Sequence, residues 1–363
     1  MMELSVVLIS KNQAWSIRRL IQSVLQATSF VSSKEIILID SASTDQTVGL
    51  ASRYPVSIIV LEPGQRLSPA IGRYVGYKQS RGEYILFLDG DTELIPGWLE
   101  HALRVMRETA DVGAVTGVVM NLPTSAIAQE LRESTHNTQT PTSREVLWCN
   151  YGGGGAAVYR RSVLEQVGTF NPYLSAEEEP ELGIRIRHAG YRLLQLDHPM
   201  AFHYNDAPVA VSTALSRRRR NFHLGIGQAA RCHLGTKLFW RWIKERWWDP
   251  TAALLMAAGL GSAFLSLLTR NFMWLGFWIL GLCLLIGSLT FRKRSLGGAL
   301  VAAFNWLIMA EGFFRGFLMR PLPPENFHAD VLVAHDPRDR DLVMAALVSK
   351  NLDTKLQHSP HRT

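Results

Sequence analysis

Cysteine is scarce in this chain, and its three copies are far apart. They are Cys149, Cys232 and Cys283 among 363 residues. No two of them have the spacing of a zinc knuckle or of a redox pair, which argues against a disulfide framework and against a cysteine-based metal cage. Isolated cysteines of this kind are typical of a protein in a reducing compartment.

The N-terminal region lacks the features of a secretory signal. The run Ser5–Ile9 is too short for the apolar core of such a signal, and no basic leader precedes it. The run has the character of a buried strand instead. We therefore expect the N-terminal domain to stay in the cytoplasm.

The chain also lacks the low hydrophobicity of disordered proteins, so general disorder is excluded. Hydrophobic residues make up 47% of the chain, and 363 residues are enough for one sizeable domain and a further region. The formal net charge of +7 favours an anionic partner, such as nucleic acid, lipid headgroups or a diphosphate. Basic and aromatic residues are concentrated in 211–250, next to long apolar runs, which argues against a nucleic-acid role.

Short apolar runs alternate with amphipathic stretches over residues 1–120. Between the first two runs, Ile17, Leu20 and Val24 have the 3-4 spacing of a helix. This alternation predicts an α/β fold with a mostly parallel sheet, which binds ligands beyond the carboxyl ends of its strands. The runs that we expect to form strands are Val6–Ile9, Ile36–Ile39, Ser57–Leu61, Tyr84–Leu88 and Val112–Val119.

Polar residues follow three of the predicted strands at their carboxyl ends. Ser10 to Asn12 follow the first strand, Asp40 to Asp45 the second, and Asp89-Gly90-Asp91 the fourth. Two carboxylates separated by a glycine at the mouth of a parallel sheet suit Mg2+ or Mn2+ bound to nucleotide phosphates. The alternative is an ordinary turn, because Asp and Gly are common turn residues.

Two further acidic groups have both a functional and a structural interpretation. Asp40 ends a strand and can hydrogen-bond a base or a ribose, whereas Asp45 is placed to cap the next helix. Glu177-Glu178-Glu179 precede Pro180, which suits the first position of a helix. Acidic residues favour the positive end of a helix dipole, so a structural role alone accounts for part of this group.

The ordered set of these motifs resembles the family-2 inverting glycosyltransferases of the GT-A fold. The set consists of Ser5–Ile9, Asp40 to Asp45, Asp89-Gly90-Asp91 and Glu178 to Arg185, and the resemblance covers roughly residues 4–205. It implies a Rossmann-like, mostly parallel catalytic domain and a nucleotide-sugar donor, with a UDP-sugar favoured. It also implies Mn2+ or Mg2+ as cofactor and a single displacement that inverts the anomeric carbon.

The resemblance and the polar clusters together define an expected donor site. Arg73 matches the family's Ala/Arg/Gly helix within Pro69–Gly76, and its alternative role is that of a solvated helix residue. Asp89 and Asp91 match the family's metal motif, and we expect Asp91 to be catalytic as well. The residues expected to bind the nucleotide-sugar are Ser10, Asn12, Asp40, Arg73 and Asp89.

The remaining site residues follow from the second half of the resemblance. His203 lies where a histidine completes the metal shell in several GT-A enzymes, although a lone histidine is more often structural. Trp148, Gly154 and Glu178 fall on the sugar and acceptor side. Glu179 falls on the base that deprotonates the acceptor hydroxyl, at a position where the family usually has Asp. The extra methylene of Glu moves this carboxylate outward and changes the acceptor geometry.

Two uncharged apolar runs follow a basic and aromatic linker at 211–250. Residues 251–269 and 272–291 each approach the roughly 20 residues that cross a bilayer, and only Arg270-Asn271 separate them, which predicts a transmembrane hairpin. Basic residues flank both ends, including Arg292-Lys293-Arg294. The positive-inside rule then places the N-terminal domain, residues 1–210, on the cytoplasmic side of the plasma membrane. The alternative is a buried helical hairpin in a soluble protein.

A third apolar stretch, 296–319, admits two interpretations. It contains Glu311 and Arg315, and charges within a membrane span are costly. A third crossing and an interfacial amphipathic helix both fit this composition. Residues 321–363 follow as a polar tail, to which we assign no chemistry.

Three functions are compatible with these features. The favoured one is an inverting glycosyltransferase that acts on a hydroxyl of a membrane-bound, lipid-linked acceptor in cell-surface glycan synthesis. The second is a polyprenyl-phosphate glycosyltransferase, whose acceptor is already an anion and needs no base. The third is a non-catalytic membrane protein that binds sugar nucleotides.

Overall fold

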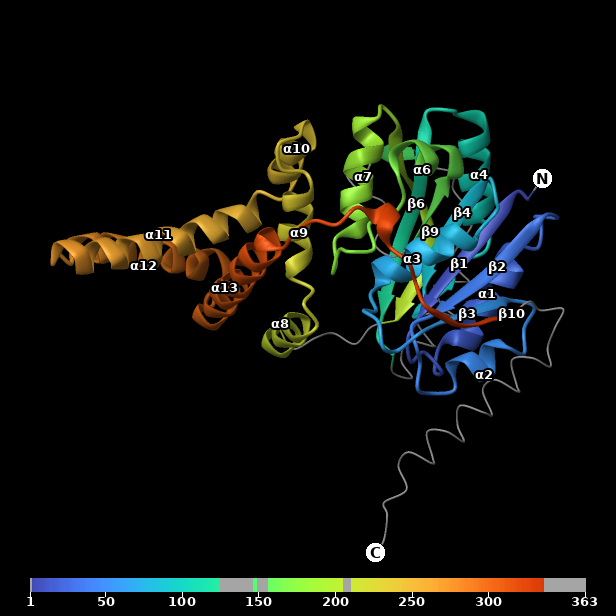
Figure 1. Cartoon of the computed structure of the whole chain (residues 1–363), viewed down its shortest axis with the longest axis horizontal. Coiled ribbons are helices and arrows are strands. Elements are labelled where there is room, and N and C mark those ends of the chain that lie inside the picture. The colour runs from blue at the N-terminus through green and yellow to red at the C-terminus, as the bar shows by residue number, and fades with distance from the viewer. Residues whose placement is uncertain (1, 125–145, 149–155, 205–209, 336–363) are drawn as a thin grey trace, which may run out of the picture. The chain divides into compact units, whose positions relative to one another are not determined.

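The computed structural model describes residues 2–124, 146–148, 156–204 and 210–335 (Figure 1). The chain divides into two compact units. The sheet unit consists of residues 1–172, 185–206 and 324–363, and the helical unit consists of residues 173–184 and 207–323. The boundaries differ from the linear division expected from the sequence, because each unit takes in a short segment that lies far away along the chain.

A mixed sheet forms the centre of the sheet unit. Its strand order is β10-β3-β2-β1-β4-β8-β6-β9-β5, with β7 paired to β9. The strands are β1 (Leu4–Ser10), β2 (Lys34–Asp40), β3 (Ser57–Leu61), β4 (Tyr84–Asp89), β5 (Thr92–Leu94), β6 (Val112–Leu122), β7 (Val146–Trp148), β8 (Ala156–Arg160), β9 (Arg192–Tyr204) and β10 (Val331–His335). The pairs β3-β2, β2-β1 and β1-β4 are parallel, whereas β8 runs antiparallel to both β4 and β6. All five predicted strands are therefore present, and the alternating segments at the start of the chain form the parallel part of the sheet.

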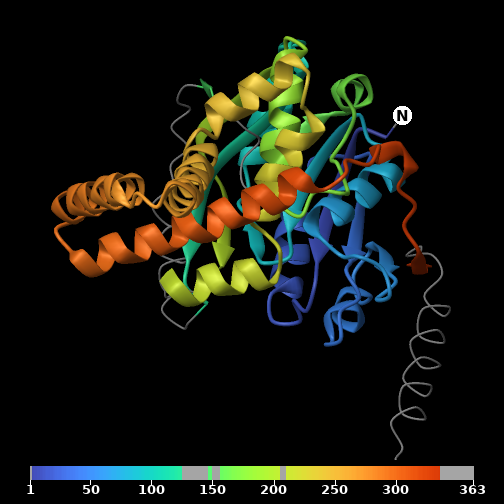
Figure 2. The ribbon, with the colours of Figure 1, turned by 60° about the vertical axis from the view of Figure 1, so that its left-hand side comes forward.

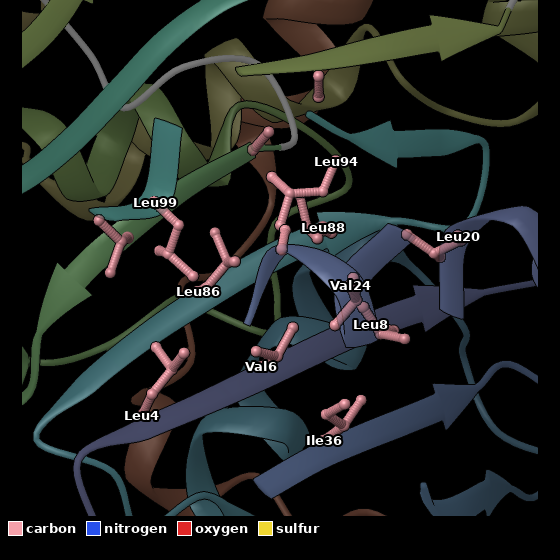
Figure 3. Packing of buried hydrophobic residues seen from close by; sticks show 14 of the residues in the cluster. Leu4, Val6, Leu8, Leu20, Val24, Ile36, Leu86, Leu88, Leu94 and Leu99 are labelled. Atoms are coloured by element: carbon pink, nitrogen blue, oxygen red, sulfur yellow. The ribbon is translucent and has the colours of Figure 1, made fainter. Parts of the chain in front are cut away.

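Helices pack on this sheet, and α1 and α4 each do so through one apolar face. They are α1 (Ile17–Ala27), α2 (Thr47–Ala51), α3 (Pro69–Gln79), α4 (Trp98–Glu108) and α6 (Arg161–Val167). Leu20 and Val24 of α1 lie in the same buried cluster as Leu8 of β1 and Leu86 of β4 (Figure 3). Full burial of one such leucine contributes about 1.5–3 kcal/mol. This core fixes the positions of β1 and β4, whose ends carry the predicted site.

Strand register brings the polar clusters level with one another. Ser10 of β1 pairs with Asp40 of β2, and Ile9 pairs with Asp89 of β4. At the other end of the sheet, Thr92 of β5 pairs with His203 of β9. The carboxyl ends of the parallel strands therefore meet at one edge, as the sequence pattern predicts.

Two glycines let α3 lie directly on β1. A Cβ atom at Gly76 would come 2.2 Å from Cγ1 of Val7, and one at Gly72 would come 3.0 Å from Cγ2 of Ile9. A larger side chain at Gly76 would push the helix away from the strand. This close packing sets the position of Arg73, which lies between the two glycines on α3.

The helical unit has a smaller core of its own. Its helices are α8 (Ala210–Arg219), α9 (Leu224–Cys232), α10 (Lys237–Glu245), α11 (Trp248–Thr269), α12 (Met273–Lys293) and α13 (Leu296–Leu318), together with the first part of α7 (Glu178–His188). The core joins Leu174 and Ile184 to Trp242 of α10 and Phe313 of α13. The indole nitrogen of the fully buried Trp242 donates to the carbonyl of Ile226, at 3.1 Å.

Glycines also bring α9 and α13 into backbone contact. A Cβ atom at Gly227 would lie 2.0 Å from the carbonyl oxygen of Phe313, and one at Gly316 would lie 2.1 Å from that of Leu224. Small residues at a helix crossing allow this approach, in membranes and outside them. The C-terminal half of α13 is therefore covered by protein along one face.

Three helices of the described chain are long and apolar enough to cross a membrane. They are Pro250–Thr269, Met273–Lys293 and Leu296–Leu318 (Figure 2). The first two form the predicted hairpin, joined at Arg270, which adopts a left-handed conformation with φ 50°. The third corresponds to the stretch for which the sequence left two interpretations open.

The described part of the predicted polar tail returns to the sheet unit. β10 pairs antiparallel with β3, and the carbonyl of Asp330 accepts hydrogen bonds from Glu62 N–H, at 2.9 Å, and from Gln65 Nε2, at 2.6 Å. The ring of Phe327 meets that of Tyr74 edge to face. Residues 324–335 are therefore part of the sheet unit, which their polar composition did not suggest.

Candidate active site

The loop after β2 is organised by Asp40. Its Oδ1 accepts a hydrogen bond from Ser43 N–H at 2.7 Å, and its Oδ2 accepts from the hydroxyls of Ser43, at 2.5 Å, and Ser10, at 3.1 Å. Asp40 is fully buried, and burial raises the pKa of its carboxyl, partly offset by these hydrogen bonds. In this conformation Asp40 shapes the loop rather than facing solvent, and its expected contact with a base stays a prediction.

Asn12 ties the loop after β1 to the loop after β2. Its side-chain oxygen accepts from Thr44 N–H at 2.8 Å, and its own N–H donates to Ser43 Oγ at 2.7 Å. Asn12 and Ala42 both adopt positive φ, at 54° and 55°. Asn tolerates this left-handed conformation better than most residues, which gives Asn12 a local structural role beside any ligand contact.

Asp45 links the same two loops instead of capping a helix in the usual way. Its Oδ2 accepts from Ala14 N–H at 3.0 Å, and its Oδ1 accepts from the N–H of Thr47, at 2.9 Å, and from its hydroxyl. Burial raises the pKa of Asp45, but these hydrogen bonds outweigh it and hold the pKa below its usual value. The cap position of α2 is Gln46, which makes no side-chain cap hydrogen bond. Asp45 thus has a structural role, as expected, but it links two loops and is not the cap residue of α2.

Arg73 forms an ion pair with the first carboxylate of the metal motif. Its Nη2 donates to Oδ1 of Asp89 at 2.8 Å, while its side chain is only 3% exposed and that of Asp89 is 33% exposed. The guanidinium also lies over the ring of Phe170, 5.9 Å from its centre. The alternative role of Arg73 as a solvated helix residue is therefore wrong. A buried cation beside Asp89 provides positive charge where a diphosphate is expected.

Asp91 and His203 face each other across the β5–β9 pair. His203 Nε2 lies 3.5 Å from Oδ2 of Asp91, and its Nδ1 lies 2.8 Å from Oδ1 of Asn121. The hydrogen bond to Asp91 raises the pKa of His203, and burial opposes this shift. Asn121 orients the ring in the way that outer ligands orient metal-binding histidines. The structure therefore brings His203 beside Asp91, and its role as a metal ligand stays a prediction.

Gly90 lies at the closest approach of the loops. A Cβ atom there would lie 2.8 Å from Cγ of Gln13 and 3.1 Å from the carbonyl oxygen of Ile9. The hydroxyl of Ser16 donates to the carbonyl of Gly90 at 2.7 Å. A larger residue between the two aspartates would displace the loop after β1, so the glycine of this triplet is required sterically.

The arrangement fits a divalent cation that arrives with a diphosphate. Within the residues that the structure describes, no three Asp, Glu, His or Cys side chains are grouped as a complete protein-only metal site. Asp91 and His203 supply one carboxylate and one imidazole, with Asp89 two residues away. Mg2+ and similar ions in nucleotide sites take one or two carboxylates and complete their shell with phosphate and water.

The other predicted residues lie elsewhere. Trp148 is in β7, which pairs with β9. Gly154 lies outside the described residues. Glu178 and Glu179 begin α7, in the segment that belongs to the helical unit.

Two residues that sequence reasoning missed contribute to the site. Ser43 makes two of the hydrogen bonds to Asp40, and Asn121 holds His203. Ser43 lies within the polar loop that the sequence highlights, so the pattern of an acid followed by small polar residues could have found it. Asn121 had no such signal, because only the parallel register of β6 with β9 places it beside His203.

A comparison with protein families finds a match for this domain. Residues 5–168 match the model of glycosyl transferase family 2. Over these residues the sheet unit is similar to family-2 glycosyltransferase domains. The match runs from β1 to α6 and thus includes the loop Asp40 to Asp45, the Asp89-Gly90-Asp91 triplet and Arg73, but not Glu177 to Glu179.

Similar proteins agree with this assignment. Glycosyltransferase AglE of Haloferax volcanii is 29% identical over 194 residues, which are 52% of this chain and 62% of that protein. O-antigen chain rhamnosyltransferase WbaN of Salmonella anatum is 28% identical over 169 residues, which are 44% of this chain and 53% of that protein. The chain thus spans less than two thirds of the length of these relatives.

A solved structure shares the fold of this chain. Mannosyltransferase PcManGT from Pyrobaculum calidifontis, in complex with GDP-Man and Mn2+, has a TM-score of 0.52 and 17% sequence identity. The similarity covers 86% of this chain and 85% of that one. It confirms the expected GT-A fold.

Proposed function

We propose that this protein is an inverting glycosyltransferase that moves a sugar from a nucleotide-sugar donor to a hydroxyl of a membrane-bound, lipid-linked acceptor in cell-surface glycan synthesis. The observation that supports it most is the pair of contacts Arg73–Asp89 and Asp91–His203 at the carboxyl end of β4 in a family-2 domain. Arg73 brings positive charge to Asp89, and Asp91 with His203 offers two metal ligands, only two residues further along the chain. Binding of a diphosphate needs both a positive charge and a metal ion.

Each residue has a defined part in this proposal. Ser10, Asn12 and Asp40 hold the nucleoside end of the donor, with a UDP-sugar favoured. Arg73 balances the charge of the diphosphate. Asp91 and His203 hold Mn2+ or Mg2+, which when bound neutralises the charge that develops on the leaving diphosphate.

The transfer itself is a single displacement. Glu179 accepts the proton of the acceptor hydroxyl as its oxygen forms a bond to the anomeric carbon. The bond from that carbon to the diphosphate oxygen breaks on the opposite side, and its electron pair leaves with the nucleoside diphosphate. The sugar is therefore transferred with inversion. Trp148, Gly154 and Glu178 belong to the acceptor side of this scheme.

The membrane region anchors the protein at the cytoplasmic face of the plasma membrane. β10 follows α13 in the chain and pairs with β3 of the sheet unit. The chain before α11 and the chain after α13 thus lie on the same side of any membrane, which requires an even number of crossings. The α11–α12 hairpin satisfies this condition, and α13, which contains Glu311 and Arg315, lies at the surface.

A donor screen tests this function. Membranes that contain the full chain are incubated with a panel of UDP- and GDP-sugars and Mn2+ or Mg2+, with and without lipid extract, and released nucleotide is measured. We expect release with one donor class that increases with the extract. Absence of turnover with every donor would contradict the enzymatic proposal.

The variant Glu179→Gln separates two acceptor chemistries. With a hydroxyl acceptor, this variant should lose at least about 100-fold in transfer rate, because general base catalysis contributes about that factor. Glu165→Gln, at an exposed position of α6, is the matched control. Retained activity of Glu179→Gln would favour a polyprenyl-phosphate acceptor, which is already ionised.

A further inference from the structure

The segment Tyr173–Ile184, which carries Glu179, is built into the helical unit. Leu174 and Ile184, near its two ends, lie in the same buried cluster as Ala229 of α9 and Trp242 of α10. A Cβ atom at Gly225 would come 2.3 Å from the carbonyl oxygen of Ala176, so α9 touches the backbone of the segment directly. The segment that contains Glu177 to Glu179 therefore packs on α9 and α10, the helices that precede the membrane region.

Three polar contacts hold the same segment. The N–H of Ser175 donates to Oε1 of Gln228 at 2.8 Å. His233 Nε2 lies 2.8 Å from Oε1 of Glu181, and Arg246 Nη2 lies 2.5 Å from Oε2 of Glu177. Gln228 is on α9, and the other two partners are the residues at the C-terminal caps of α9 and α10.

The His233–Glu181 contact is the most enclosed of the three. The side chains are 9% and 4% exposed, whereas those of Arg246 and Glu177 are about one quarter exposed, at 26% and 25%. Removal of one member of a buried pair leaves the other without compensation, which is costly. Of these three contacts, loss of the one at His233 is therefore expected to loosen the segment most.

The backbone at the start of α7 needs this support. Glu177 adopts φ 66°, a left-handed conformation that is rare for a residue other than Gly, Asn or Asp. Its carbonyl accepts a hydrogen bond from the N–H of Glu181 at 3.0 Å, and this bond forms the first turn of α7. Such a conformation persists only where the surroundings determine it, and the contacts at Ser175, Glu177 and Glu181 lie on both sides of this point.

We propose that Gln228, His233 and Arg246 are positioning residues that hold the segment so that Glu179 is oriented for acceptor deprotonation. This inference rests on the proposed function of Glu179. It predicts that the transfer step depends on α9 and α10, whereas nucleotide binding, which belongs to the sheet unit, does not. Misplacement of a catalytic group by about 1 Å can cost about 100-fold in rate, so modest loosening of the segment has a large effect.

The test compares His233→Ala, Gln228→Leu and Arg246→Ala in the full-length protein. His188→Ala, at an exposed position near the end of α7, and Arg241→Ala, at an exposed position of α10, are the matched controls. Three quantities are measured. They are hydrogen exchange in peptides that cover 173–184, the Kd for UDP and for GDP in the presence of Mn2+, and kcat for nucleotide release with lipid extract.

We expect exchange in 173–184 to become about three- to tenfold faster in the three variants, because polar contacts that hold the segment are lost. Exchange in β1 and β4 should not change. For His233→Ala, kcat should fall about 10- to 100-fold while the nucleotide Kd stays within about twofold. His233→Gln, whose amide nitrogen can replace Nε2, should recover part of the loss. In the Glu179→Gln background, His233→Ala should have almost no further effect, because both act through the same step.

Unchanged exchange in all three variants would overturn the positioning role. Equal losses of nucleotide affinity and kcat, or multiplied effects in the Glu179→Gln background, would also overturn it, since they indicate general destabilisation. If exchange responds as expected but the wild-type protein transfers no sugar, the proposed function fails and the structural tie between α9 and the segment stands.

Discussion

The two units differ in the exposure of their apolar side chains. In the sheet unit, every residue of β1 is buried, and Leu8, Leu86 and Leu20 share one core. In the helical unit, no residue of α12 is buried, and Phe277 and Leu284 are 62% and 67% exposed. Large apolar surfaces of this extent on a soluble protein are rare, because burial of such surface drives folding in water. The contrast indicates that the sheet unit is folded for water and the α11–α12 hairpin for lipid.

The units also differ in how they use charge. In the sheet unit, charged groups gather where strands end, as Arg73 with Asp89 and Asp91 with His203. In the helical unit, charged groups join one helix or segment to another, as Arg218 of α8 does with Glu311 of α13. The first arrangement is suited to binding a charged ligand, and the second is suited to holding segments in place.

The largest effect is expected from a change in the charged site of the sheet unit. Asp91→Asn should lower the transfer rate at least about 100-fold, because it removes a carboxylate ligand and the partner of His203. Asp111→Asn, at a surface ion pair with Arg192 of the same unit, should leave the rate unchanged. Nucleotide release measures both. Full activity of Asp91→Asn with an intact circular dichroism spectrum would contradict the proposed metal site.

Metal removal gives a parallel test on the wild-type protein. A chelator should abolish transfer to the same extent as Asp91→Asn, and addition of Mn2+ or Mg2+ should restore it. The Asp91→Asn variant should recover little at the same metal concentration. Turnover that persists after exhaustive chelation would show that this site works without a divalent cation.

A charge placed on the apolar helices should separate α12 from α13. Leu284→Arg, in the middle of α12, should disfavour membrane insertion by about 2.5–3.5 kcal/mol. Leu307→Arg, in α13, should have a smaller effect, because the pairing of β10 with β3 makes α13 a surface helix in our proposal. The fraction of protein that resists alkaline extraction from membranes measures both. Equal loss of anchoring in the two variants would contradict the two-crossing topology.

Loss of the buried cation should destabilise the sheet unit moderately. Arg73→Met keeps the volume but removes the partner of Asp89, and should cost about 1–3 kcal/mol, less than for a fully buried pair because Asp89 is 33% exposed. A lower Tm and a weaker affinity for UDP should appear together. Arg18→Met, at an exposed position of α1, should change neither. A variant with wild-type Tm would show that the pair contributes nothing to stability.

The smallest effect concerns the pH dependence of stability at Asp40. Because its pKa is raised from 3.8 in the folded state, the folded chain binds this proton more tightly than the unfolded chain. The wild-type protein should therefore lose stability as pH rises from about 4 to the raised pKa, and Asp40→Asn should not. Tm measured across this range gives the comparison.

Asp45 provides the internal control, since its pKa is lowered. Its carboxylate stabilises the fold above the unfolded pKa, and that contribution is lost as pH falls through the folded value. Relative to the wild-type protein, Asp45→Asn should therefore lose stability as pH rises, the opposite of Asp40→Asn. The same pH trend in both variants would contradict the assigned shifts.

Local patterns of the sequence determined much of this protein. The five apolar runs, the helix spacing at Ile17, Leu20 and Val24, and the two uncharged runs after residue 250 all reappear as the predicted elements. Each of these signals depends on neighbours within one or two turns or on strand alternation, which a sequence shows directly. The triplet Asp89-Gly90-Asp91 belongs here too, because its position at a strand end follows from the run before it.

Only the tertiary structure decided which of these residues meet. Arg73 is buried beside Asp89, and His203 faces Asp91, because α3 packs on β1 and β9 pairs with β5. The return of β10 to β3 and the attachment of 173–184 to α9 likewise depend on contacts between segments far apart in the chain. Such contacts depend on register and on side-chain packing between distant elements, and no local periodicity encodes them.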